Sequence, residues 1–113
     1  MNAEYLNMSV PFSAGGLYST VDDLLKWTTA IPTAMASEFP EAGKDDWHYG
    51  YGLFVLKRAG YRCLAHDGGV NGFLAVFNYY PEIDASLIVL SNLLDPRAMQ
   101  PVVDRLSTIL TAL

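Results

Sequence analysis

The segment best suited to chemistry is residues 66–73, which read His-Asp-Gly-Gly-Val-Asn-Gly-Phe. Gly68, Gly69 and Gly72 follow an apolar run, and glycines there let the backbone approach another molecule closely. Backbone N–H groups exposed in this way can bind an anionic atom, with the ionisable His66 beside them. The alternative is a glycine-rich hairpin loop in which His66 only packs or forms a hydrogen bond.

Other residue sets indicate chemistry less strongly. His48 and His66 could form a metal site together with Asp45 and Asp46. The histidines are 18 residues apart and the carboxylates do not follow the spacing of a known metal-binding motif, so a solvated loop is favoured. The single cysteine, Cys63, has apolar neighbours in a predicted strand, which favours a buried thiol over a reactive one. No Ser is followed three residues later by Lys, and no G-x-S-x-G elbow occurs. We therefore expect no metal, no cofactor and no complete nucleophilic centre in this sequence.

Composition excludes several classes of protein. The chain has 113 residues, a net charge of −5 and 51% hydrophobic residues, which indicates a single folded domain and excludes intrinsic disorder. A net acidic chain without a Lys/Arg cluster is not expected to bind nucleic acid. The apolar runs are too short to span a membrane, and the N-terminus lacks the pattern of a signal peptide. We assign no location to the chain on this basis.

The residues around these sites predict two helices. Ser19 or Thr20 can cap the first helix, since Asp22 and Asp23 stand three positions further on, and Pro32 is expected to end it. The last helix begins with Asp95 as N-cap and Pro96 at its first position. Its apolar residues form one stripe that is expected to lie against a sheet. They are Met99, Val102, Val103, Leu106, Ile109, Leu110 and Leu113.

Between the helices the sequence predicts an antiparallel sheet. Its strands are expected at 53–57, 61–66, 73–80 and 85–92, joined by short turns, with 67–72 as a glycine-dense loop. The last two strands are apolar at nearly every position, so both of their faces should be covered. The fold class is therefore α+β, with a four-stranded antiparallel sheet packed against N- and C-terminal helices.

The remaining segments are predicted as irregular. Residues 1–18 should form a lead-in, and residues 33–47 an exposed connection with a short helical turn around 34–39. The lead-in is expected to pack through Tyr5, Leu6, Phe12 and Leu17.

Several segments together resemble a known family. Residues 14–24 resemble the A-G-G-L-x-S-T-x-x-D-L segment of the serine β-lactamase-like family, which includes class C β-lactamases, penicillin-binding DD-peptidases and related esterases. Residues 49–53, 66–73, Pro81 and 89–92 then follow in the order that this family shows. The resemblance implies part of the β-lactamase/transpeptidase-like fold and an activity of acyl transfer to serine.

The resemblance also implies roles for four residues. The family uses a Ser-x-x-Lys nucleophile, a Tyr-x-Asn or Tyr-x-Ser element, and a Lys-Thr-Gly or His-x-Gly strand, and only the last has a counterpart here. By this resemblance His66 and Gly69 are catalytic: His66 supports the electrostatics and Gly69 donates a backbone N–H to the oxyanion hole. Asp67 and Gly68 are then placed at the substrate, where Gly68 lets the strand edge come close.

The departures from the family pattern define a further expectation. Without Ser-x-x-Lys, residues 1–113 are interpreted as a single partial domain, the C-terminal portion of a larger serine hydrolase that is inactive alone. In the family, strands that precede the nucleophile helix complete the sheet, so the missing N-terminal part is the expected partner. Substrates would be β-lactams, peptidoglycan-type D-Ala-D-Ala peptides or small esters, in a family that is commonly extracytoplasmic. The alternative is a non-catalytic interaction module that associates through the exposed edge of strand 85–92, with a homodimer as its first expected form.

Overall fold

The computed structural model describes residues 3–35 and 47–113 and contains three α-helices and five strands. The first two helices are α1 (Phe12–Gly15) and α2 (Val21–Met35), and the last is α3 (Pro96–Leu110). The strands are β1 (Trp47–Gly50), β2 (Leu53–Arg58), β3 (Tyr61–Val70), β4 (Phe73–Tyr80) and β5 (Ala85–Ser91), with a 3-10 turn at Pro81–Ile83. The α+β class is confirmed. Of the helices in the described ranges, none has the length and apolarity to cross a membrane.

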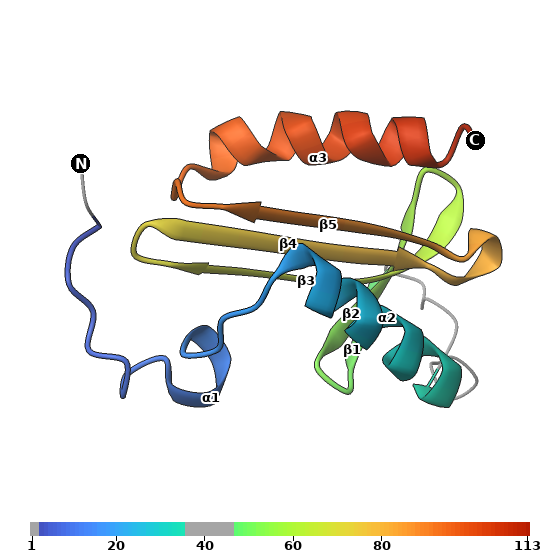
Figure 1. Cartoon of the computed structure of the whole chain (residues 1–113). Helices are drawn as coiled ribbons and strands as arrows, with labels where there is room; N and C mark the ends of the chain where they lie inside the picture. Colours follow the sequence, from blue (N-terminus) through green and yellow to red (C-terminus); the bar gives the residue numbers. More distant parts are fainter. Residues whose placement is uncertain (1–2, 36–46) are drawn as a thin grey trace.

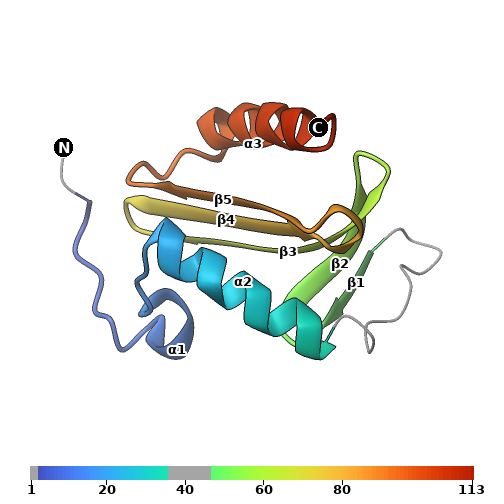
Figure 2. The same ribbon diagram turned by 45° about the vertical axis from the view of Figure 1, so that its right-hand side comes forward.

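The five strands form one antiparallel sheet in the order β1-β2-β3-β4-β5, so each strand pairs with its neighbours in sequence. The predicted count of four strands was wrong, because Trp47–Gly50 pairs with β2 as an additional edge strand. The aromatic residues at 47 and 49 favour a strand, but Gly50 and Gly52 are typical of a turn. The glycines therefore hid β1 from sequence-based prediction. The β1–β2 hairpin is steeply inclined to β4 and β5 (Figures 1 and 2).

The glycine-rich segment lies mostly in a strand, which corrects the predicted loop. β3 continues through Asp67 to Val70, and Val70 pairs with Phe73 across a two-residue turn at Asn71-Gly72. Glycine is disfavoured in strands, but seven consecutive residue pairs with β4 hold this segment extended. At the turn, Gly72 has a φ of 83°, which glycine adopts without strain.

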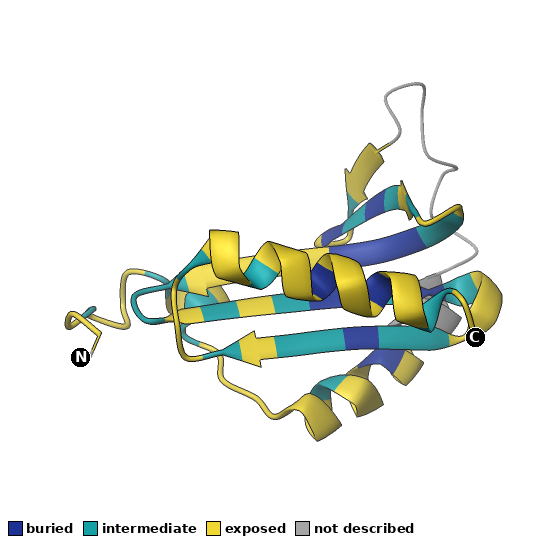
Figure 3. Ribbon diagram, turned by 90° about the horizontal axis from the view of Figure 1, so that it is seen from above, coloured by how far each residue is buried: buried dark blue, intermediate teal, exposed yellow. Residues whose placement is uncertain are grey.

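Helices cover both faces of the sheet (Figure 1). On the α2 face, the ring of Trp27 meets that of Phe77 edge to face at 5.5 Å, and Ser86 Oγ donates to Thr28 Oγ1 at 3.3 Å. On the opposite face, Leu110 of α3 packs against a buried cluster that includes Tyr80. Most of the buried residues lie in β2 to β5, between the helices (Figure 3). The prediction that the last two strands are covered on both faces is confirmed for most of their length, but Phe73, Ala75 and Leu90 are exposed.

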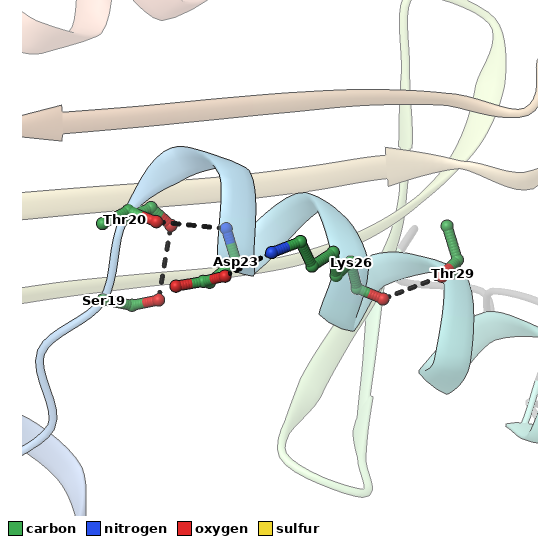
Figure 4. Close-up of polar contacts among 5 residues, drawn as sticks. All are labelled: Ser19, Thr20, Asp23, Lys26 and Thr29. Carbon is green, nitrogen blue, oxygen red and sulfur yellow. Dashed lines mark hydrogen bonds and ion pairs between the residues drawn. The ribbon is translucent and has the colours of Figure 1, made fainter.

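Both predicted helix starts are confirmed. Thr20, rather than Ser19, caps α2: its Oγ1 accepts a hydrogen bond from the backbone N–H of Asp23 at 3.2 Å (Figure 4). Asp95 caps α3 by accepting from the N–H of Arg97 at 3.0 Å. The predicted end at Pro32 was wrong, since α2 extends to Met35. A proline removes one backbone hydrogen bond but does not prevent a helix that tertiary contacts hold. The rest of the turn predicted at 34–39 lies outside the described residues.

Two packing predictions were wrong in part. Of the apolar stripe on α3, Val103 is buried and Met99 and Leu110 are half-buried. Val102, Leu106, Ile109 and Leu113 are exposed. Of the four lead-in residues that were expected to pack, Leu6 is half-buried, while Tyr5, Phe12 and Leu17 are exposed. The described residues therefore cover only part of the apolar surface that the sequence presents.

Candidate functional site

The candidate site lies along an edge of β3. β2 pairs with β3 only from Tyr61 to Ala65, whereas β4 pairs with β3 up to Val70. From His66 onward, one side of β3 has no strand beside it within the described ranges 3–35 and 47–113. An unpaired strand side presents backbone N–H and C=O groups to whatever approaches it. The divergence of β2 thus exposes the part of β3 that the sequence indicated.

His66 is exposed and lies beside two aromatic rings. Its Nε2 is 3.4 Å from the hydroxyl oxygen of Tyr49 in β1. Its ring centroid is 6.2 Å from that of Tyr49 and 5.9 Å from that of Phe54 in β2. Because Tyr49 and Phe54 are a cross-strand pair with centroids 4.6 Å apart, they form a wall against which the imidazole is held. Sequence reasoning did not identify either aromatic as a partner of His66; the only signal was the glycine-aromatic alternation at 49–52.

Gly68 and Gly69 differ in what surrounds them. A Cβ added at Gly69 would lie 3.1 Å from Leu74 Cδ2 and 3.2 Å from Leu94 Cδ1, so packing restricts that position. A Cβ added at Gly68 would meet no atom within 4 Å. Adjacent residues of a strand point to opposite faces, so the open position and the packed one lie on different sides of β3. The described residues give Gly68 no packing reason to be glycine.

Asp67 lies at a small cavity. The cavity has a volume of about 160 Å³ and is lined by residues of β2, β3, β4 and α3. Besides Asp67, its polar lining comprises Arg58, His66, Asn78 and Gln100. With its amide oriented to satisfy both groups, the buried Asn78 accepts from Arg58 Nη1 at 3.1 Å and donates to the carbonyl of Phe77 at 3.0 Å. This bond fixes Arg58 at the cavity wall.

The two segments that carry the family resemblance lie against each other. A Cβ added at Gly15 in α1 would be 2.6 Å from Val70 Cγ1, so only glycine allows this close approach. Beside it, Asn71 Nδ2 donates to the carbonyl of Glu4 at 3.4 Å, and Gly72 lies against Ala3. The lead-in and α1 are therefore packed at the β3–β4 turn (Figure 1).

The weaker candidates do not form sites in the described part of the chain. No group of three or more His, Cys, Asp or Glu side chains there could hold a metal ion, and Asp45 and Asp46 lie outside the described residues. His48 is exposed on β1. Cys63 is fully buried, and burial raises the pKa of its thiol to about 11. A thiol with this pKa is protonated near neutral pH, as expected for a core residue rather than a nucleophile.

Comparison with known proteins decides the family. The sequence model described as Beta-lactamase matches residues 2–109. The chain belongs to the beta-lactamase family. The match includes both the A-G-G-L segment and the His66 segment. Gly15 of the first segment lies against Val70 of the second. Comparisons with curated proteins and with solved structures gave no match. The beta-lactamase family supports a hydrolase-like assignment.

Proposed function

We propose that the chain contributes one wall of the active site of a beta-lactamase-family serine hydrolase, whose Ser-x-x-Lys nucleophile lies in residues outside this sequence. The observation that carries the proposal is the unpaired side of β3 from His66 to Gly69, where an acyl group can approach the backbone. The family match supports a reaction of the serine hydrolase class, and the unpaired edge of β3 supports its location on this chain.

The proposed reaction is acyl transfer followed by hydrolysis. The serine oxygen attacks the substrate carbonyl carbon as its proton passes to the acid/base group of the family's Ser-x-x-Lys and Tyr-x-Asn elements, and the carbonyl oxygen takes the negative charge of the tetrahedral intermediate. The N–H of Gly69 donates to that oxygen, which is the largest electrostatic contribution expected of this chain. Collapse of the intermediate expels the leaving group, and water then hydrolyses the acyl-enzyme.

His66 and Gly68 act on the substrate in this proposal. His66 supplies a polar, ionisable group that Tyr49 and Phe54 hold in place. The open space above Gly68 supports close passage of the substrate along the strand, since no internal contact requires glycine there. Candidate substrates are β-lactams, D-Ala-D-Ala peptides and small esters, and His66 at the position of the family lysine favours the peptides and esters.

The exposed lead-in supports the presence of a further part of the domain. Tyr5, Phe12, Leu17 and Tyr18 are each more than three-quarters exposed. Exposed apolar patches of this kind mark surfaces that contact another protein or domain. The lead-in packs at the β3–β4 turn, so a segment that covers this surface would lie close to the end of β3 that carries Gly69.

A non-catalytic interaction module is the second candidate. The observation that favours it is the lack of Ser-x-x-Lys in a chain whose β5 has no strand on its outer side among residues 3–35 and 47–113. Such a module would bind a partner through main-chain pairing rather than catalyse a reaction.

The test compares the 113-residue chain with the longest open reading frame that contains it. We expect Ser-x-x-Lys upstream in that frame, and turnover of a chromogenic cephalosporin or p-nitrophenyl acetate by the longer protein only. Turnover by the 113-residue chain that a serine-directed phosphonate abolishes would contradict the proposal. A reading frame without Ser-x-x-Lys would favour the interaction module instead.

A further inference from the structure

A cavity lies between the sheet and α3, and Ala65 forms its floor. The strand register places Phe54, Ala65 and Asn78 side by side across β2, β3 and β4, with their side chains on the same face of the sheet. Alanine is much smaller than either neighbour, so it leaves a space between them. Val103 of α3, which is 2% exposed, lines this space from the side of the helix. The result is a cavity of about 160 Å³.

The cavity opens at the proposed site. Ala65 and Asn78 are 7% and 1% exposed and form its inner end, whereas His66 and Asp67 are exposed and line its other end. Asp67 and Gly69 are two residues apart on the same face of β3, a distance of about 7 Å. An acyl group whose carbonyl oxygen lies at the N–H of Gly69 can therefore extend along β3 into the cavity. This step rests on the proposed function.

The volume and the apolar lining of the cavity suit one aromatic ring. An apolar protein cavity of about 150 Å³ is large enough to bind benzene. A phenyl group would therefore fit in this cavity, and its burial there would remove apolar surface from water. The apolar part of the lining consists of Phe54, Leu56, Ala65, Val76 and Val103.

The charged residues of the lining favour a ring without a negative charge. In the amide orientation that satisfies both of its groups, Asn78 accepts from Arg58 Nη1 and holds the guanidinium at the cavity wall. Within residues 3–35 and 47–113 Arg58 forms no ion pair, so its charge is available to the face of an aromatic ring. Asp67 at the opening repels an anion.

We propose that this cavity is a specificity pocket for an aromatic ring at the far end of the substrate's acyl group, with Ala65 as the residue that determines its size. A ring bound there holds the acyl chain along the unpaired side of β3 and places the carbonyl group at Gly69. Among the candidate substrates, the pocket favours those with an aromatic ring about 7 Å from the scissile carbonyl over acetyl esters.

Binding to the 113-residue chain tests the pocket independently of activity. The probe is phenylacetamide, and acetamide is the control ligand that lacks the ring. In two-dimensional proton–nitrogen NMR spectra, phenylacetamide should cause saturable shifts of the backbone amides of Ala65, Asn78 and Val103. We expect a Kd of about 1–10 mM, the range for a fragment of about ten heavy atoms, and no saturable shifts with acetamide. Absence of saturable shifts at these residues with phenylacetamide would overturn the proposal.

Variants at Ala65 test whether the ring binds in the cavity itself. Ala65→Leu fills the cavity and should abolish the shifts. Ala98→Leu is the matched control, because it adds the same atoms at an exposed position of α3, and it should bind as wild type does. Ala65→Val adds fewer atoms, should weaken binding to an intermediate degree, and keeps the test valid where circular dichroism shows that Ala65→Leu does not fold. Equal binding by wild type and the Ala65 variants would overturn the proposal.

Kinetics of the longer protein test the role of the pocket in the reaction. p-Nitrophenyl 4-phenylbutyrate and p-nitrophenyl acetate share a leaving group, and only the first carries a ring at the required distance. We expect kcat/KM to be at least about tenfold higher for the phenylbutyrate, and we expect Ala65→Leu, but not Ala98→Leu, to remove this preference. Equal kcat/KM values for the two esters in wild type would overturn the proposal. Turnover of neither ester would contradict the proposed function, and binding of phenylacetamide to the 113-residue chain would then decide whether the pocket exists.

Discussion

The hydroxyl of Tyr49 and Nε2 of His66 lie 3.4 Å apart, although β1 and β3 are not neighbours in the sheet. The contact therefore reaches across β2, whose Phe54 ring is 4.6 Å from that of Tyr49 and 5.9 Å from that of His66 between centroids. As a result, the strand that the sequence did not predict is the one that positions the imidazole. A change in β1 should alter the orientation of His66 without touching β3.

The first prediction concerns His66 in the longer, active protein. His66→Ala should lower kcat/KM about 10- to 1,000-fold, the range for loss of one acid/base or electrostatic group. His48→Ala is the matched control, because His48 is also an exposed histidine but, as the strand residue before Tyr49, points to the opposite face of β1. Steady-state kinetics with the preferred substrate measures both. Equal losses in the two variants would indicate that His66 acts only through folding.

The second prediction separates a functional glycine from a structural one. Gly68→Ala should leave the urea midpoint of the 113-residue chain unchanged, because an added Cβ meets no atom within 4 Å. In the longer protein the same change should reduce kcat/KM. Gly72→Ala should destabilise the chain by about 1–2 kcal/mol, because Gly72 has a φ of 83° and lies against Ala3. A destabilised Gly68→Ala would mean that packing, rather than substrate, requires glycine there.

The sequence predicted the elements whose signals are local. Thr20 and Asp95 fix the two helix starts through side-chain caps, and strand positions follow from runs of apolar residues. The ladder with β4, by contrast, determines that Gly68 and Gly69 are extended, and a ladder depends on residues distant in sequence. The His66–Tyr49 contact could not be predicted for the same reason, since it requires β1 and the twist of the sheet.

The third prediction tests the cap of α2. Thr20→Ala should lower the free energy of unfolding by about 1 kcal/mol, because the N–H of Asp23 loses its acceptor. Ser19→Ala is the neighbouring control, since the Ser19 hydroxyl only donates to the carbonyl of Thr20 at 3.3 Å. Urea unfolding followed by circular dichroism compares the two (Figure 4). A larger loss of stability in Ser19→Ala than in Thr20→Ala would show that Ser19, and not Thr20, caps α2.

The fourth prediction follows from the buried thiol. Burial raises the pKa of Cys63 from 9.0 to about 11, so the folded state keeps its proton where the unfolded state loses it. Stability is therefore unaffected below pH 9 and falls between pH 9 and 11, by about 1.4 kcal/mol per pH unit. Cys63→Ala removes this contribution, while Tyr79 and Tyr80, whose pKa values are also raised by burial, remain in both proteins. Urea unfolding at pH 8 and pH 10.5 should show a larger decrease in the free energy of unfolding for wild type than for Cys63→Ala. Equal decreases in the two proteins would contradict a buried, protonated thiol.

The order of the strands also has a kinetic consequence. Every strand pairs with the next one along the chain, so the sheet can form from successive hairpins, each with a small cost of loop closure. The contact of Asn71 with Glu4, in contrast, joins residues 67 positions apart. We therefore expect the sheet to fold before the lead-in docks, which makes α1 the last element to become ordered and the first to detach.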